Sequence, residues 1–186
     1  MTDSQIIDDL FISRMFLNKN SGAYGNLNVV LDEPDEERSR VTIDGLPPDA
    51  IIIKVDNFPP LNNVFNGVSG ECSRCDYLIF SESDRCIIFI EIKNSTEKEH
   101  QLVKQLRGGL RFLKYLQLIL DFHKGIPDFA SDYKIRFVSF LHTDTTLNKK
   151  PTKQFPSQLH DSPENMWKYT TGNKAVKYKQ IASLNR

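Results

Sequence analysis

The sequence predicts an α/β domain with a mixed central β-sheet flanked by helices. Two strongly apolar runs, residues 76–80 and 86–93, are separated by a short polar stretch, which is typical of a β-hairpin. A long amphipathic helix follows them, and another apolar run follows the helix at residues 133–142. Because a helix that crosses a sheet joins parallel strands, this order predicts antiparallel and parallel pairs in one sheet.

The chain before the hairpin is expected to contribute a helix and two strands. Residues 4–16 carry apolar side chains at helical spacing, which predicts an amphipathic helix. Residues 18–70 are rich in turn residues and prolines, and the runs 26–31 and 50–55 within them have strand character. The run 50–55 is the candidate for the first strand of the core.

The numbering of the hairpin predicts which residues face one another. The polar stretch 81–85 suits a turn, with either two or four residues at its tip. Both turns place Asp76 opposite Glu91. Because side chains alternate along a strand, Glu91 and Lys93 are expected on one face.

These charged residues stand at the end of strands that are otherwise apolar. A buried charge is unfavourable unless it is paired or bound to a metal. Two directly opposed carboxylates have Cβ atoms roughly 4.5–5.5 Å apart and repel each other unless a cation lies between them. Mg²⁺ prefers one or two carboxylates, water and phosphate oxygens, and a lysine adds a positive charge beside it. Asp76, Glu91 and Lys93 are therefore candidates for a site that holds a metal and a phosphodiester.

This pattern of an aspartate, an apolar hairpin and then Glu-x-Lys resembles the PD-(D/E)XK nuclease superfamily. The resemblance spans residues 70–142 and implies a restriction-endonuclease-like core. It implies that Asp76 and Glu91 bind Mg²⁺, for which Mn²⁺ can substitute, and that the Ile92 carbonyl is a further ligand. It also implies that Lys93 orients the attacking water or stabilises charge in the transition state.

Two functional hypotheses and one structural alternative follow. The first hypothesis is a Mg²⁺-dependent nuclease that hydrolyses phosphodiester bonds, with DNA preferred and defence against foreign DNA as its role by family analogy. The second is a catalytically inactive module of the same fold that binds nucleic acid or a protein partner. The structural alternative is a half-buried ion pair of Glu91 with Lys93 or with an arginine. If both strands of DNA are cut, a homodimer is expected because two active sites are needed. A partner protein is the expected means of targeting.

The long helix after the hairpin carries further candidates. Residues 96–99 are typical of a capping box, with Ser95 or Thr96 as the N-cap. Many members of the superfamily have a glutamine on this helix that points at the active site. Gln105 is the better match to it, and Gln101 is the second choice.

A stripe of four cations on the same helix is either a track for phosphates or a solvated face. It consists of Lys104, Arg107, Arg111 and Lys114. Gly108 and Gly109 each destabilise a helix by about 1 kcal/mol relative to alanine. Close packing against the sheet, or the approach of a nucleic-acid backbone, is therefore expected at these glycines.

Length and composition predict a single domain over residues 1–186, because 186 residues with 39% hydrophobic content can bury a core. The core is expected over about 50–142. Residues 143–186 form a basic extension, with eight lysines and arginines against three acids, that suits a nucleic-acid backbone, a docking partner or solvent. No run suits a membrane span or a signal peptide, so a cytoplasmic location is expected.

The three cysteines suit a reducing compartment. Cys72 and Cys75 have the spacing of half a zinc site, which Cys86 and a histidine would have to complete. Cys75 also stands where the proline in the name of the superfamily would be.

Overall fold

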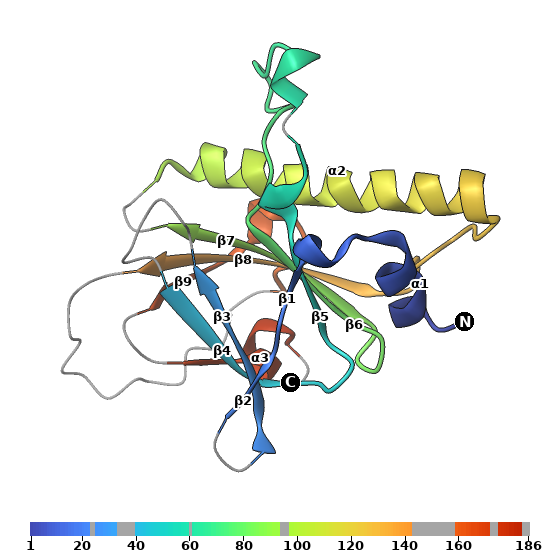
Figure 1. The fold of residues 1–186 in the computed structure, drawn as a ribbon. Coiled ribbons are helices and arrows are strands. Elements are labelled where there is room, and N and C mark those ends of the chain that lie inside the picture. The colour runs from blue at the N-terminus through green and yellow to red at the C-terminus, as the bar shows by residue number, and fades with distance from the viewer. Residues whose placement is uncertain are drawn as a thin grey trace.

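A six-stranded mixed sheet lies between a helical layer on one face and a smaller sheet on the other (Figure 1). The computed structural model describes residues 1–22, 25–32, 40–59, 61–93, 97–142, 159–171 and 175–183. The predicted α/β class, with antiparallel and parallel pairs in one sheet, is confirmed.

The main sheet has the spatial order β1 (Phe16–Leu17), β5 (Ile51–Lys54), β6 (Tyr77–Ser81), β7 (Cys86–Lys93), β8 (Lys134–His142) and β9 (Trp167–Thr171). Its first four strands pair antiparallel, whereas β8 is parallel to both β7 and β9. The second sheet has the order β10 (Val176–Lys177), β4 (Arg40–Leu46), β3 (Leu27–Asp32) and β2 (Asn20–Ser21). The helices are α1 (Asp3–Leu10), α2 (Glu99–Lys124) and α3 (Tyr178–Ile181). Short 3-10 helices are η1 (Ser13–Met15), η3 (Val55–Asn57), η4 (Leu61–Asn63) and η5 (Pro163–Asn165).

Two segments differ from the sequence prediction. The N-terminal helix was expected over residues 4–16, but α1 ends at Leu10, and Phe16 then pairs with Ile53 at the edge of β5. An exposed strand edge offers unpaired backbone groups, so this pairing competes with continuation of the helix. The core was expected over about 50–142, but β9, from the basic extension, adds to the main sheet beside β8.

The register of the β6–β7 hairpin agrees with the numbering argument. Leu78 pairs with Phe89 and Ser81 pairs with Cys86, so the turn is the longer of the two predicted forms. Side chains on β7 alternate between two cores. Phe89 packs with the helices of the first layer, whereas Ile88 packs between the two sheets. Glu91 and Lys93 continue the series that faces the helices.

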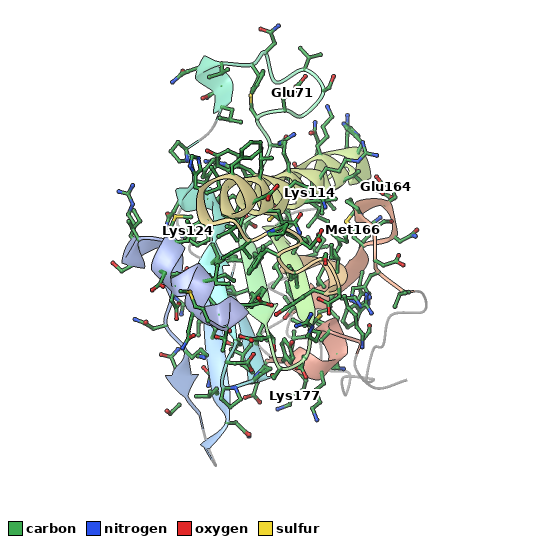
Figure 2. All side chains as sticks on the ribbon, turned by 90° about the vertical axis from the view of Figure 1, so that its right-hand side faces the viewer. Glu71, Lys114, Lys124, Glu164, Met166 and Lys177 are labelled. Atoms are coloured by element: carbon green, nitrogen blue, oxygen red, sulfur yellow. The ribbon has the colours of Figure 1, made fainter. Side chains whose placement is uncertain are left out.

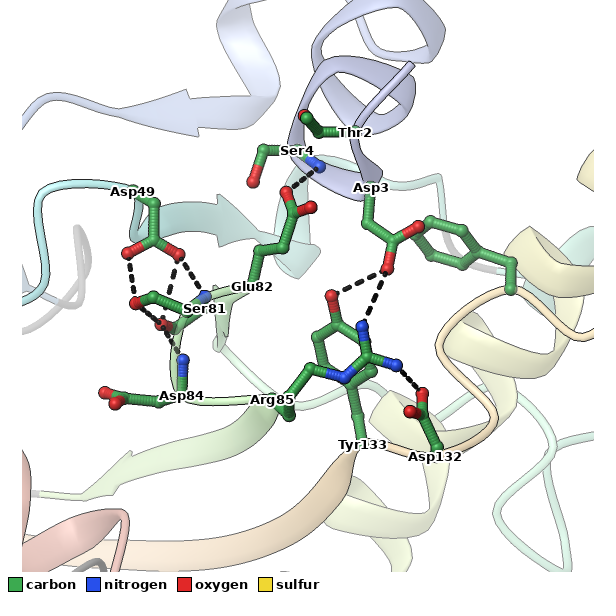
Figure 3. Close-up of polar contacts among 12 residues, drawn as sticks. Thr2, Asp3, Ser4, Asp49, Ser81, Glu82, Asp84, Arg85, Asp132 and Tyr133 are labelled. Atoms are coloured by element: carbon green, nitrogen blue, oxygen red, sulfur yellow. Dashed lines mark hydrogen bonds and ion pairs between the residues drawn. The ribbon is translucent and has the colours of Figure 1, made fainter.

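A carboxylate from outside the hairpin holds its turn in place (Figure 3). Asp49, just before β5, accepts hydrogen bonds from the Ser83 N–H at 2.8 Å, the Ser83 hydroxyl at 2.6 Å and the Ser81 hydroxyl at 3.2 Å. Burial alone would raise the pKa of the Asp49 carboxyl, but these hydrogen bonds outweigh it and hold the pKa below its usual 3.8. The ionised carboxylate therefore stabilises the folded turn.

The arginine at the end of the turn joins it to α1 and β8 (Figure 3). Arg85 has a φ of 48°. Its guanidinium lies 4.5 Å from the centroid of the Tyr133 ring and 3.8 Å from the Asp3 carboxylate. The Tyr133 hydroxyl donates to the same carboxylate at 2.7 Å. The turn end of the hairpin is thus fixed on two sides.

Replacement of Asp49 is expected to weaken the fold in a pH-dependent way. Asp49→Ala should lower the free energy of unfolding by about 1–2 kcal/mol near neutral pH, because several hydrogen bonds are lost. Since the pKa of Asp49 is depressed in the fold, its contribution is present above its unfolded pKa and is lost as the pH falls through the folded value. Urea denaturation of both proteins over this pH range measures the difference.

The matched control is Asp9→Ala, on the exposed part of α1, which should change stability by less than about 0.5 kcal/mol. A stability difference for Asp49→Ala that stays constant down to pH values well below 3.8 would contradict the proposed clamp.

Candidate active site

Asp76 lies beside Glu91 where β6 begins and β7 nears its end. The Asp76 N–H donates to the Ile90 carbonyl at 3.1 Å. The Ile92 N–H donates to Asp76 Oδ2 at 2.6 Å, so a side-chain carboxylate accepts a bond that a strand carbonyl would otherwise accept. The Asp76 carbonyl in turn accepts from the Val55 N–H at 2.9 Å. Asp76 is therefore held between the ends of β5 and β7.

The carboxylates of the motif are buried, and an ammonium lies against one of them. Asp76 is 5% exposed and Glu91 is 0% exposed. Lys93 Nζ lies 2.7 Å from Glu91 Oε1 and 3.9 Å from Glu97 Oε2. The ion pair of the structural alternative is thus present. It also compensates the burial of Glu91, because a buried carboxylate requires a charged or hydrogen-bonded partner.

Asp56 is a further acid near the motif that the sequence argument missed. It lies on η3, directly after β5. Burial raises the pKa of the Asp56 carboxyl, while the charges of Arg74, Lys54 and Lys93 act to lower it. Its Oδ1 atom lies 3.9 Å from Arg74 Nε. The signal in the sequence was an acid immediately after the first core strand, at the sheet edge where Asp76 also lies.

Cys75 is buried next to these carboxylates. Burial raises the pKa of its thiol, and the charges of Glu91 and Asp76 raise it further, so the thiol stays protonated. Cys86 lies at the opposite end of β7 from Glu91 and does not complete a zinc site with Cys72 and Cys75. In the described part of the chain, no three His, Cys, Asp or Glu side chains are grouped to hold a metal.

The two helical glycines let α2 pack against the segment that leads into Asp76. A Cβ atom at Gly108 would overlap the Ser73 carbonyl oxygen and lie 2.9 Å from Arg74 Cα. A Cβ atom at Gly109 would overlap the Cys75 sulfur. Of the two predicted reasons for these glycines, the structure shows close packing within the chain. The contact fixes the backbone immediately before the candidate metal ligand.

Gln105 is half-buried on α2, whereas Gln101 is exposed. The Gln105 Oε1 atom is shielded from solvent and has no hydrogen-bond partner among the described residues. A buried polar atom of this kind is destabilising unless a ligand or water satisfies it. Gln105 and Gln101 thus differ in burial, and the role of Gln105 at the active site stays a prediction.

The start of α2 differs from the prediction. Its N-cap is Lys98 and the helix begins at Glu99, without a side-chain hydrogen bond to the cap. The predicted capping box at residues 96–99 is therefore wrong, since Glu99 lies at the first helical position. The predicted N-cap residues Ser95 and Thr96 lie outside the described residues.

Three of the four cations in the predicted phosphate track bind oxygen atoms of the same chain. Arg111 donates to the carbonyls of Gly70 and Ser73, at 3.1 and 2.8 Å. Lys104 donates to the carbonyl of Val68 at 3.3 Å, and Arg107 donates to the carboxylate of Glu164 at 2.5 Å. Lys114 is exposed on α2 (Figure 2). The first three therefore hold the 68–73 segment and η5 against the helix, and their contact with phosphates stays a prediction.

Comparison with protein-family models, with curated proteins and with solved structures gave no match. Among the helices of the described residues, none combines the length and apolar character needed to cross a membrane.

Gly108→Ala is expected to destabilise the protein by about 1–3 kcal/mol, because the added methyl group must displace the backbone at Ser73. Denaturant unfolding measures this loss. Lys114→Ala, at an exposed position of the same helix, should change stability by less than about 0.5 kcal/mol. A Gly108→Ala protein that is more stable than the wild type, as helix propensity alone predicts, would refute the close approach.

Proposed function

We propose that the protein is a Mg²⁺-dependent nuclease that hydrolyses phosphodiester bonds. The observation that carries the proposal is the meeting of two buried carboxylates, Asp76 and Glu91, with the Lys93 ammonium at one end of a hairpin. The surrounding topology supports it. The antiparallel strands β5, β6 and β7, followed by α2 and the parallel strand β8, agree with the restriction-endonuclease-like core that the motif implies.

The donor set of this site suits Mg²⁺. Asp76 and Glu91 offer carboxylate oxygens, and the Ile92 carbonyl would be a further oxygen ligand. Mg²⁺ keeps several waters and is commonly held by only one or two carboxylates, so a cluster of three acids is not required. The nearby Asp56 adds negative charge. When bound, Mg²⁺ would polarise the phosphate and lower the pKa of water. Mn²⁺ is expected to substitute, because it also accepts oxygen ligands.

The side chains around the metal ligands have separate roles in this proposal. Glu91 holds the Lys93 ammonium at 2.7 Å and so directs it along the face of the sheet. Lys93 donates hydrogen bonds to the scissile phosphate and stabilises its developing charge. Gln105 accepts a hydrogen bond from water or substrate through its shielded amide oxygen. Asp56 acts as a positioning residue, through its charge on Lys93 and its contact with Arg74.

The substrate and the biological role rest on the family analogy. By this analogy we propose DNA as the preferred substrate and defence against foreign DNA as the biological role. Cutting both strands requires two active sites, which a homodimer supplies, and a partner protein would supply targeting.

Metal binding should stabilise the protein independently of any cleavage. Mg²⁺ at about 100 times its dissociation constant adds about 2.7 kcal/mol to the free energy of unfolding, and so should raise the melting temperature of the wild type. Asp76→Asn should remove this shift, whereas Asp121→Asn, at an exposed position of α2, should keep it. Thermal melts with Mg²⁺ and with EDTA test this. An equal shift in wild type and Asp76→Asn would contradict the assigned ligand.

Cleavage should require the motif residues. Asp76→Ala and Lys93→Ala are expected to reduce cleavage of plasmid or single-stranded DNA by at least about 100-fold. Lys93→Gln should show a similar loss while keeping a hydrogen-bond donor for Glu91, which separates catalysis from folding. The control is Lys124→Ala, at the C-terminal end of α2 (Figure 2). Full activity of either alanine variant, or activity that survives EDTA, would overturn the proposal.

A further inference from the structure

A pocket of about 390 Å³ lies next to Lys93, between the ends of the parallel strands and the beginning of α2. Its polar lining includes Lys93, Glu97, Glu99, Ser139, Lys168 and Thr170. This volume is within the usual range of ligand sites in proteins. The pocket therefore extends the candidate active site towards β8 and β9.

The parallel register brings residues of three strands to the same face. Glu91 on β7 pairs with Ser139 on β8, and Ser139 pairs with Lys168 on β9. Paired residues of neighbouring strands point to the same side of a sheet. Trp167 and Tyr169, the neighbours of Lys168, pack in the core on the other side. Lys168 thus comes to the face of Glu91 and Lys93 from the segment that the sequence indicated as an extension.

Ser139 is a buried polar residue that lines this pocket. It is 5% exposed. Among the described residues its hydroxyl makes no side-chain hydrogen bond, and it is not one of the side-chain atoms that are fully shielded from solvent without a partner. The hydroxyl is therefore open to the pocket, where water or a ligand can bind it.

Lys168 is a second hydrogen-bond donor in the pocket, and its ion-pair partner Glu99 can be replaced by another anion. Lys168 Nζ lies 2.5 Å from Glu99 Oε2, and the two side chains are 52% and 62% exposed. Ion pairs this exposed contribute little to stability, so another anion can replace the carboxylate. Glu99 is also the first residue of α2, whose N-cap makes no side-chain hydrogen bond. The first N–H groups and the dipole of the helix add to the attraction for an anion.

We infer that this pocket binds a backbone phosphate of the nucleic-acid strand, next to the phosphate that is cleaved at Lys93. The inference rests on the proposed function, because Lys93 defines the cleaved position. The Ser139 hydroxyl and the Lys168 ammonium donate to the phosphate. Glu99 is the group that the phosphate displaces from Lys168. Lys168 and Ser139 are therefore positioning residues for the substrate strand.

Three variants have different expected effects on binding. Lys168→Ala should weaken binding of a single strand about fivefold and reduce the slope of log K against log salt by about 0.7, as for the loss of one phosphate contact. Ser139→Ala should weaken binding about threefold without a change in slope, because a hydroxyl carries no charge. Glu99→Gln should tighten binding, because it removes the competing carboxylate.

The measurement is fluorescence anisotropy of short labelled strands in EDTA, where metal-dependent cleavage does not occur. The full chain is titrated against DNA and RNA strands of one sequence in parallel, since both carry the phosphate. The matched control is Lys177→Ala. The exposed Lys177 also forms an ion pair, with the half-buried Asp44 of the second sheet, and lies on the far side of the molecule from α2 (Figure 2). The Lys177→Ala variant should keep the affinity of the wild type for the strand and its slope of log K against log salt.

Failure of this inference can be told apart from failure of the nuclease proposal. Unchanged affinity and slope in Lys168→Ala, or no binding of either strand by the wild type, overturns the phosphate site. A lack of Mg²⁺-dependent cleavage by the wild type overturns the nuclease proposal. If binding responds to the three variants as expected in a protein that does not cleave, the phosphate site stands and only the catalytic assignment falls.

Discussion

The antiparallel pairing of β6 with β7 determines the positions of Asp76, Glu91 and Lys93 in the candidate site. A slip by one residue would turn Glu91 and Lys93 to the opposite face, into the apolar core between the sheets. The hydrogen bonds to Asp49 at the turn and the Asp76–Ile92 bond at the other end hold this register from both sides. The long apolar run between them supplies the burial that makes the hairpin rigid.

The same pairing creates an electrostatic constraint. Two buried carboxylates and the neighbouring Asp56 share a small region with Lys93. Burial raises the pKa of the Cys75 thiol there, and the negative charge of these acids raises it further. The Glu91–Lys93 ion pair is compatible with both the structural and the catalytic interpretation, because a lysine that compensates a buried acid can also donate a hydrogen bond to a phosphate. The close approach of α2 through Gly108 then fixes the backbone next to Asp76. Packing and charge therefore converge on one end of the hairpin.

Much of this arrangement could be predicted because it depends on local periodicity. The spacing of apolar residues was sufficient to predict the hairpin register, the shared face of Glu91 and Lys93 and the crossover to β8. Contacts between distant segments could not be predicted in this way. The approach of Asp56, the addition of β9 to the sheet and the carbonyl acceptors of Arg111 all depend on tertiary packing. The predicted capping box was wrong because α2 begins at Glu99 after the N-cap Lys98, so Glu99 is not at the third helical position that a capping box requires.

We expect Asp76 and Glu91 to bind one divalent cation. Anomalous diffraction from crystals soaked in Mn²⁺ tests it most directly, because the signal locates the ion without reference to activity. We expect an anomalous peak in coordinating contact with a carboxylate oxygen of each residue, with Lys93 beside it. A peak elsewhere, or no peak while the Glu91–Lys93 pair stays intact at saturating Mn²⁺, would contradict it.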